Sequence, residues 1–455
     1  MVVVEDASGY QGCADCVVAP ASVEDLAATM QRAAALGAAV TPSGAGTGIT
    51  GGRCPQGGWL VSTERLRRLE IGRGRAIAGA GVLLRDLQAA AARTGQFYAP
   101  DPTEWTASIG GNIATNASGA RSFLYGSTRR HLLSLTAVFA DGTVRTFRRG
   151  EPLDFPYQPV RQPATTKNTA GYCLPENATW IDLLCGSEGT LALVAEAELS
   201  LLPQPEALLS GVVFFPELDA ALAAVDQWRP VPQLRMLEFM DEASLSVLRQ
   251  DAAAPAPPAA RACLMIEQQL DGLEGDPVDM WLERLAAAGA LEESWFETTA
   301  AGRERFRAFR HALPEAVNAR VRSRGFEKIS SDFAVPLARN TEMMDFYRRE
   351  LESGFAGRYT IYGHIGDAHV HVNILPETAG DSARGRAWML EAARVAVRLG
   401  GTVSAEHGLG KRKRALLELM YSPAEIASMR AVKSRLDPQW RLSPGTLFPD
   451  PNVTI

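Results

Sequence analysis

The amino-acid sequence predicts an α+β protein with two domains and a C-terminal segment. Its 455 residues exceed the size of a typical single domain. Glycine-dense loops separate short strand-like and helical segments in the first half of the chain, and strands and helices alternate again between residues 263 and 375. We therefore expect one domain at 1–206, a second at 207–425, and a C-terminal segment at 426–455 that returns to the first domain.

The elements of the first domain follow from helix caps, apolar spacing and turn residues. Ser22 is a favoured N-cap residue, apolar residues follow it at helical spacing, and Gly37 is a residue type that often ends a helix. Asp141-Gly142 is a typical hairpin turn. The other elements expected here are strands at 38–40, 59–62, 76–80, 135–140 and 189–202 and a helix at 83–93.

The second half of the chain predicts a different arrangement. Residues 207–250 indicate a strand followed by a helix, and the alternation that comes after them indicates a further α+β unit. Residues 385–455 are mostly helical before a proline-rich tail.

Composition excludes several classes of function. The chain is 46% hydrophobic and 22% charged, as in soluble globular proteins, and its net charge is -6. Nucleic acids and anionic membranes bind basic surfaces, so we expect neither as a partner. The N-terminus lacks the basic region of a secretion signal, and the six scattered cysteines are typical of reduced thiols. We expect a cytoplasmic protein, either free or peripheral to the inner membrane.

The most conspicuous local feature is a loop with five glycines between positions 44 and 52. Glycine permits positive φ and close approach of a ligand to the backbone, and successive N–H groups in such a loop can bind a pyrophosphate. A dinucleotide-binding Rossmann turn is excluded, because more loop with Gly57 and Gly58 follows instead of a helix. An ordinary surface loop is the alternative at this point.

Two further segments strengthen the phosphate-binding interpretation. A second loop, made of residues 100–103, residues 109–116 and Gly119, supplies more glycines together with amide and hydroxyl side chains, which can hydrogen-bond a dinucleotide. Residues 185–191 form a tight turn that leads into the strand expected from 191 to 202.

Four of the six histidines fall at positions 364, 369, 371 and 407. On a strand, His369 and His371 share one face, and His364 can reach the same point across a turn at Gly366-Asp367. The pair Glu406-His407 adds a carboxylate and another imidazole. Two imidazoles and a carboxylate can hold a catalytic metal that keeps positions open for substrate. Histidines packed in the core or exposed at the surface are the alternative.

With these segments together, the sequence resembles the FAD flavoproteins of the vanillyl-alcohol-oxidase type, in the branch of D-lactate, glycolate and D-2-hydroxyglutarate dehydrogenases. The resemblance extends from about residue 18 to residue 449. It implies a two-subdomain FAD-binding domain, an α+β substrate (cap) domain with an antiparallel sheet, and a helical C-terminal segment. The matching motifs are TPSGAGTGITGG, DPTEWTASIGGNIATNASG, KNTAGYCL, GSEGTL, GHIGDAHVHVN and SAEHGLG.

The resemblance also implies which residues contact FAD. No histidine lies in the first loop, where some relatives attach FAD covalently, so we expect non-covalent FAD. The implied contacts are Pro42, Gly44, Gly46, Thr47, Gly48, Thr50, Gly51, Asp101, Gly110, Gly111, Asn112, Thr115, Asn116, Gly119, Gly189 and Thr190.

For the histidine motif, the resemblance implies that His364, His371 and Glu406 bind a divalent metal (Zn, Mn or Fe) and that His407 is the catalytic base. Relatives usually have GDGN where this chain has Gly-Asp-Ala-His369. The role of His369 therefore stays open between metal binding, substrate contact and packing, and we favour support of the metal ligands.

Three residues align with the substrate contacts of the family: Arg310, Lys328 and Asn373. A carboxylate substrate needs such cationic anchors, although a solvated helix face also explains basic residues here. Pro314 stands where hydroxyglutarate enzymes tend to have threonine, which favours a shorter substrate. Ser443-Pro-Gly445 departs from the usual NPGK motif, so a lysine contact to the flavin region is missing.

The sequence thus predicts an FAD-dependent dehydrogenase that oxidises a small D-2-hydroxy acid to the 2-oxo acid. We expect metal-assisted proton abstraction by His407 and hydride transfer to flavin N5. Because no iron–sulfur motif is present, electrons should pass to an external electron-transfer flavoprotein, cytochrome or quinone, and a homodimer is compatible with these expectations. The alternatives are an oxygen-using sugar or alcohol oxidase, a flavoprotein subunit of a glycolate-oxidising complex, and a binding protein without FAD.

Overall fold

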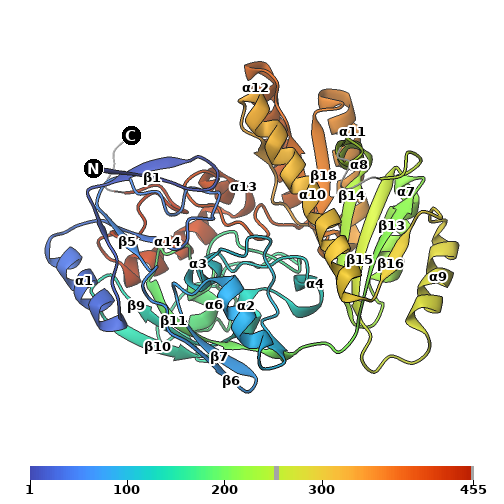
Figure 1. Cartoon of the computed structure of the whole chain (residues 1–455). Coiled ribbons are helices and arrows are strands. Elements are labelled where there is room, and N and C mark those ends of the chain that lie inside the picture. The colour runs from blue at the N-terminus through green and yellow to red at the C-terminus, as the bar shows by residue number, and fades with distance from the viewer. Residues whose placement is uncertain (251–255, 452–455) are drawn as a thin grey trace.

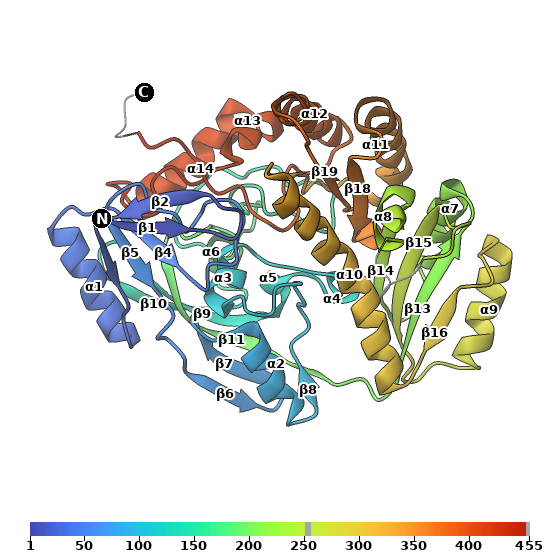
Figure 2. The same ribbon diagram turned by 45° about the horizontal axis from the view of Figure 1, so that its top comes forward.

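The N-terminal half contains a small parallel sheet and a larger antiparallel sheet (Figures 1 and 2). The computed structural model describes residues 1–250 and 256–451. The parallel sheet consists of β3 (Cys16–Val18), β5 (Trp59–Ser62) and β4 (Val40–Ser43), with β5 in the middle. The antiparallel sheet has the order β10 (Val144–Arg148), β9 (Leu132–Val138), β11 (Leu193–Ser200), β7 (Arg75–Gly79) and β6 (Leu69–Gly72).

The first helix begins as predicted, but the strand after it begins later. Ser22 Oγ accepts a hydrogen bond from Asp25 N and caps α1 (Val23–Ala35). Gly37 N and Ala38 N then donate to carbonyls of the last helical turn, as in a Schellman motif. The predicted strand at 38–40 is therefore displaced to β4, because residues 37 and 38 complete the helix end.

The segment 109–116, expected as a loop, begins instead with a short helix, α3 (Ile109–Ala114). Ser108 caps α3, which packs against β7 and β11. A Cβ atom at Gly110 would lie 2.6 Å from the Ala80 Cβ atom, so glycine here permits close helix–strand packing. The predicted hairpin at Asp141-Gly142 is confirmed by the antiparallel pairing of β9 and β10.

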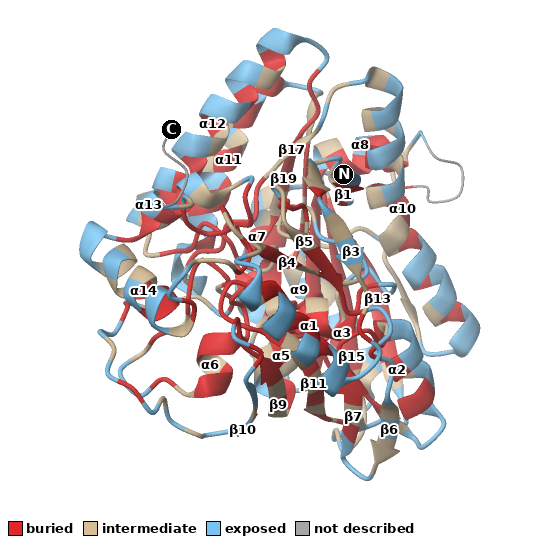
Figure 3. Ribbon diagram, turned by 90° about the vertical axis from the view of Figure 1, so that its left-hand side faces the viewer, coloured by how far each residue is buried: buried red, intermediate tan, exposed pale blue. Residues whose placement is uncertain are grey.

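The C-terminal half is built on a seven-stranded sheet in which all described pairs are antiparallel. Along β13, Val213 and Phe215 point to one core and Val212 and Phe214 to another, so both faces are buried (Figure 3). The strand order is β16 (Trp295–Glu297), β13 (Leu208–Phe215), β15 (Ala262–Gln269), β14 (Leu234–Asp241), β18 (Tyr359–Gly363), β19 (His371–Ile374) and β17 (Ile329–Ser330).

Helices pack around these sheets, and their bounds complete the secondary structure. The remaining helices are α2 (Leu84–Ala92), α4 (Ser122–Tyr125), α5 (Thr128–His131), α6 (Trp180–Leu184), α7 (Leu218–Trp228), α8 (Glu242–Leu248), α9 (Pro277–Ala288), α10 (Ala300–Arg324), α11 (Asn340–Phe355), α12 (Ala379–Arg398), α13 (Leu417–Met420) and α14 (Pro423–Leu436). The short strand pairs are β1 (Val2–Glu5) with β2 (Gln11–Ala14) and β8 (Gln96–Phe97) with β12 (Leu202–Pro203). Among the described helices, none is both long enough and apolar enough to cross a bilayer.

The end of the chain packs against its beginning. Val40 N donates to Arg441 O at 2.8 Å, and Ser443 N donates to Val40 O at 2.7 Å, so residues 441–443 lie along β4. In Figures 1 and 2, α14 accordingly lies with the N-terminal half and away from the seven-stranded sheet. The domain division at 206 and 425 itself stays a prediction.

Candidate functional site

A cavity of about 440 Å³ lies between the glycine-rich loops of the N-terminal half and the seven-stranded sheet. Its lining comes from segments 42–53, 102–119 and 187–194 on one side and from 238–240, 310–314, 328–330, 362–373 and 406–407 on the other. The predicted FAD contacts in its wall are Pro42, Gly44, Gly46, Thr47, Gly48, Thr50, Gly110, Gly111, Asn112, Thr115, Gly119 and Gly189.

The first glycine loop presents free hydrogen-bond donors to this cavity. The backbone N–H groups of Gly46, Thr47 and Gly48 donate to no protein atom in the described part of the chain. Gly46 has a φ of +86°, a conformation that L side chains rarely adopt. Successive unpaired N–H groups bind anions, so the loop fits a dinucleotide pyrophosphate.

Four predicted FAD contacts lie outside the cavity wall. Gly51 N donates to Asp6 Oδ2 at 2.7 Å, and Asp101 forms an ion pair with Arg121. The other two support neighbouring turns: Asn116 Oδ1 accepts from Arg129 N, and Thr190 Oγ1 donates to Ser187 O. Their role as FAD contacts stays a prediction.

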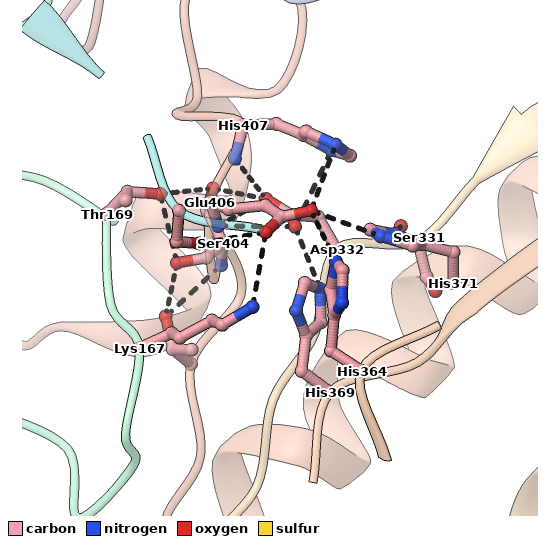
Figure 4. Close-up of polar contacts among 12 residues, drawn as sticks. Lys167, Thr169, Ser331, Asp332, His364, His369, His371, Ser404, Glu406 and His407 are labelled. Carbon is pink, nitrogen blue, oxygen red and sulfur yellow. Dashed lines mark hydrogen bonds and ion pairs between the residues drawn. The ribbon is translucent and has the colours of Figure 1, made fainter. Parts of the chain in front are cut away.

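The structure brings the predicted metal ligands together at one oxygen atom. Glu406 Oε1 lies 3.3 Å from His364 Nε2 and 3.2 Å from His371 Nε2 (Figure 4). These residues come from three places: the turn after β18, the start of β19, and the loop after α12. Segments distant in sequence therefore converge on one point of the cavity wall.

An ion pair and a hydrogen bond at Nδ1 orient the two imidazoles toward this point. His364 Nδ1 lies 2.5 Å from Glu238 Oε1, and His371 Nδ1 lies 3.4 Å from Ser331 O. When both rings are neutral, each Nδ1 carries the hydrogen and each Nε2 directs a lone pair at Glu406 Oε1, which offers only lone pairs itself. Three lone pairs this close repel each other unless a cation or proton lies between them. The donor set fits a divalent metal.

The second oxygen of Glu406 is held by protein donors. Ser118 Oγ donates to Oε2 at 2.9 Å, and Lys167 Nζ donates at 3.3 Å. Burial raises the pKa of Glu406, but the charges of Lys167 and His364 outweigh burial and hold this pKa well below its usual range. Glu406 is thus ionised and oriented with one oxygen toward the imidazoles.

Glu238 links the metal site to the predicted substrate anchor. Its second oxygen lies 2.5 Å from Arg310 Nε, so Arg310 already has a buried ionic partner. Burial and Lys167 lower the pKa of His364, but Glu406 and Glu238 outweigh them and raise it to about 9. Negative charge around the imidazole therefore favours a cationic state at this position, which a bound metal would also satisfy.

Asp332, which lies outside the predicted site residues, organises the other two histidines. Its Oδ1 lies 3.1 Å from His369 Nε2 and 3.5 Å from His407 Nδ1. Its Oδ2 accepts from Ser404 Oγ at 2.7 Å and from His407 N at 2.9 Å. Burial lowers the pKa of His407 to about 4 although Asp332 opposes the shift, and burial lowers the pKa of His369 to about 3.

His369 and His407 therefore differ in what they can do. His369 is fully buried beside Asp332, two residues before the start of β19, and it is absent from the cavity lining. His407 lines the cavity, and its ring stacks on that of His371 with centroids 5.2 Å apart. With Nδ1 toward Asp332, its Nε2 lone pair is available to accept a proton.

The remaining predicted anchors also line the cavity. Asn373 is buried on β19, and its Nδ2 has no hydrogen-bond partner among the described atoms. Lys328 Nζ lies 3.4 Å from Asn318 Oδ1, and burial together with Lys413 lowers its pKa. Pro314 lies within α10 and faces the same cavity.

Sequence reasoning missed the charged residues that support this site: Lys167, Glu238 and Asp332. Lys167 begins the KNTAGYCL motif, and Asp332 follows Lys328-Ile-Ser-Ser, so both lie in or beside segments that were singled out. Glu238 lies between the apolar residues Leu237 and Phe239 in a strand that is buried throughout, and a charged residue in such a position is unusual enough to be a signal.

Family models match both halves of the chain. A model described as "FAD linked oxidases, C-terminal domain" matches residues 204–447, and one described as "FAD binding domain" matches residues 14–148. A solved structure of alkyldihydroxyacetonephosphate synthase aligns with a TM-score of 0.65 at 16% identity and covers 94% of this chain and 75% of that one. At this identity the likeness concerns the fold alone.

Curated relatives are similar over almost the whole chain. A D-lactate dehydrogenase of Archaeoglobus fulgidus is 32% identical, over 94% of this chain and 90% of the relative. The glycolate oxidase subunit GlcD of Bacillus subtilis is 30% identical, over 96% and 90%. A D-2-hydroxyglutarate dehydrogenase of Xanthomonas citri is 29% identical, over 95% and 89%.

Proposed function

Because this chain belongs to the FAD-linked oxidase family, we propose that it oxidises a small D-2-hydroxy acid to the 2-oxo acid with the help of a divalent metal. Membership in the family confirms the predicted FAD, the oxidoreductase class and the vanillyl-alcohol-oxidase type of fold. The finer proposal is supported by one observation above all. His364, His371 and Glu406 converge in the wall of the cavity that the glycine-rich loops of the N-terminal half also line.

The metal ligands would serve to bind the substrate near the flavin. A divalent metal held there would supply Lewis-acid coordination, which lowers the pKa of a bound hydroxyl group. The donors supplied by the chain are two neutral imidazoles and one carboxylate, a set that leaves coordination positions for two substrate oxygens. Lys167 and Ser118 keep Glu406 in the orientation that this set requires.

His407 is the proposed base. It faces the cavity beside the metal ligands, with Nε2 3.8 Å from Glu406 Oε1. As the 2-hydroxyl proton moves to Nε2, the C2–H bond breaks with its electron pair and a carbonyl group forms at C2. FAD supplies the acceptor for that hydride. Asp332, facing Nδ1, stabilises the positive charge that His407 gains.

Lys328 and Asn373 are the proposed contacts of the substrate carboxylate. Both line the cavity, and the free Asn373 Nδ2 is a donor that substrate would satisfy. Arg310 is paired with Glu238, so its contribution to carboxylate binding is smaller than that of an unpaired arginine. Its main effect would be to hold Glu238 against His364.

The test is anaerobic reduction of the protein-bound flavin by a panel of D- and L-2-hydroxy acids. The reduction is monitored as the loss of flavin absorbance. We expect bleaching by at least one D-acid, none by its L-enantiomer, and none in His407→Asn with FAD still bound. Bleaching of His407→Asn at the wild-type rate would exclude His407 as the base. Bleaching by sugars or simple alcohols, with hydrogen peroxide formed in air, would instead identify an oxidase. The external electron acceptor stays a prediction.

A further inference from the structure

Arg53 lies over the first glycine loop, in the wall of the cavity. A Cβ atom built on Gly46 would overlap Arg53 Nη1, so the guanidinium occupies space that only glycine leaves open. Arg53 follows the loop directly and lines the same cavity as Gly46, Thr47 and Gly48. The loop and the arginine therefore present their donors to one region.

The charge of Arg53 has no counter-ion in the described part of the chain. Its Nε is buried and makes no hydrogen bond, and no carboxylate forms an ion pair with its guanidinium. The three acids of the N-terminal half that line the cavity are engaged by other protein donors, and Glu104 accepts from Thr106 N and Thr106 Oγ1. Asp6 accepts from Ser8 N, Tyr10 N and Gly51 N, and Glu188 accepts from Leu409 N and Gly410 N.

The arginine and lysine that also line the cavity, Arg310 and Lys328, come from the C-terminal half of the chain. Arg310 is paired with Glu238, and Lys328 precedes β17 of the seven-stranded sheet. Arg53 is thus the cation beside the free N–H groups of the loop. Arg53 is partly buried, and an unpaired guanidinium that is partly removed from water is stabilised by a doubly charged anion that accepts two parallel hydrogen bonds.

We propose that Arg53 is the counter-ion of the FAD diphosphate. In this arrangement the N–H groups of Gly46, Thr47 and Gly48 bind the phosphate oxygens from one side, and the Arg53 guanidinium neutralises their charge from the other. The proposal concerns cofactor binding alone, so it does not depend on which substrate is oxidised or on whether a metal is bound.

The test compares FAD with riboflavin, which lacks the diphosphate. Flavin is removed from the full-length protein, and each flavin is titrated back while its fluorescence is followed. Loss of a charge-assisted pair should weaken FAD binding by Arg53→Gln about 10- to 100-fold. Riboflavin binding should not change, and Arg53→Lys should recover part of the FAD affinity. Arg73→Gln, an exposed arginine of the same half, is the matched control and should bind both flavins normally.

Two results would overturn the proposal. Unchanged FAD affinity in Arg53→Gln would show that the guanidinium does not contact the diphosphate. Equal weakening of FAD and riboflavin would show a structural role for the side chain. If Arg53→Gln does not fold, Arg53→Lys is measured in its place, because lysine keeps the positive charge but not the two parallel N–H donors of the guanidinium. A loss confined to FAD supports the proposal, and no loss or an equal loss for both flavins refutes it.

Discussion

Replacing Asp332 by asparagine should disable His407 without removing the flavin. Asp332 Oδ2 accepts from Ser404 Oγ and from His407 N, so these two donors will hold the asparagine oxygen in the same place. The amide NH₂ group then occupies the position of Oδ1, which lies 3.5 Å from His407 Nδ1. Because NH₂ is a donor, Nδ1 must become an acceptor, and the ring hydrogen moves to Nε2. An Nε2 that carries hydrogen cannot take the substrate proton.

The rate of flavin reduction should fall about 10²- to 10⁴-fold, which is the usual effect of losing a general base. The cost in folding stability should be smaller, about 1–3 kcal/mol, because the two strong donors keep an acceptor. In the assay, the holoenzyme is mixed rapidly and anaerobically with a hydroxy acid that reduces the wild-type flavin. The absorbance of the flavin is recorded over time. Flavin content and urea denaturation report the fold.

Asp241→Asn is the matched control. Asp241 is also buried, and it accepts backbone N–H groups of Ser244 and Ile361. This variant should lose stability and keep its rate of flavin reduction. The reasoning would be refuted if Asp332→Asn reduced its flavin at the wild-type rate, or if Asp241→Asn slowed flavin reduction to the same extent.

Three further predictions follow from the same contacts. Glu238→Gln removes the negative charge beside His364 Nδ1 and leaves one acceptor oxygen for the two donors His364 and Arg310, so it should weaken metal binding about 10- to 100-fold in a metal titration; unchanged affinity would contradict the role given to Glu238. Burial raises the pKa of Glu188 to about 7. The contribution of the Glu188 carboxyl group to folding stability is therefore complete below its usual pKa of 4.5 and is lost as pH rises toward 7. The difference in melting temperature between Glu188→Gln and wild type should therefore shift in favour of Glu188→Gln as the pH is raised from acidic to alkaline values. A difference that is the same at all pH values would refute this. Gly110→Ala should destabilise the fold by about 1–3 kcal/mol in urea denaturation, since its Cβ atom would collide with Ala80, and an unchanged midpoint would contradict the packing argument.

Local signals in the sequence predicted much of the fold. Ser22 as a cap and Asp141-Gly142 as a hairpin turn depend on neighbouring residues alone, and both are confirmed. The segment 109–116 was misjudged because its glycines suggest a loop, whereas Gly110 allows α3 to approach Ala80. Close packing between distant segments has no local signal, so such glycines cannot be told from ligand-binding ones in one sequence.

In the candidate site, too, some residues could be predicted from the sequence and others could not. His364, His371 and Glu406 were grouped from spacing and family resemblance, and the structure brings them together. The residues that orient them were missed, because Lys167, Glu238 and Asp332 come from segments far apart in the chain. Charged residues of this kind look like surface residues in a sequence until the fold buries them. His369, whose role the sequence leaves open, is buried against Asp332, and its support of the metal ligands stays a prediction.

The most direct test of the central claim is the rate of flavin reduction in protein stripped of metal by a chelator and then reloaded. We expect the stripped protein to keep its FAD but not to be bleached by the D-2-hydroxy acid, and we expect a divalent metal to restore bleaching in wild type and not in Glu406→Gln. Bleaching at the same rate in stripped and reloaded protein would contradict a metal at His364, His371 and Glu406.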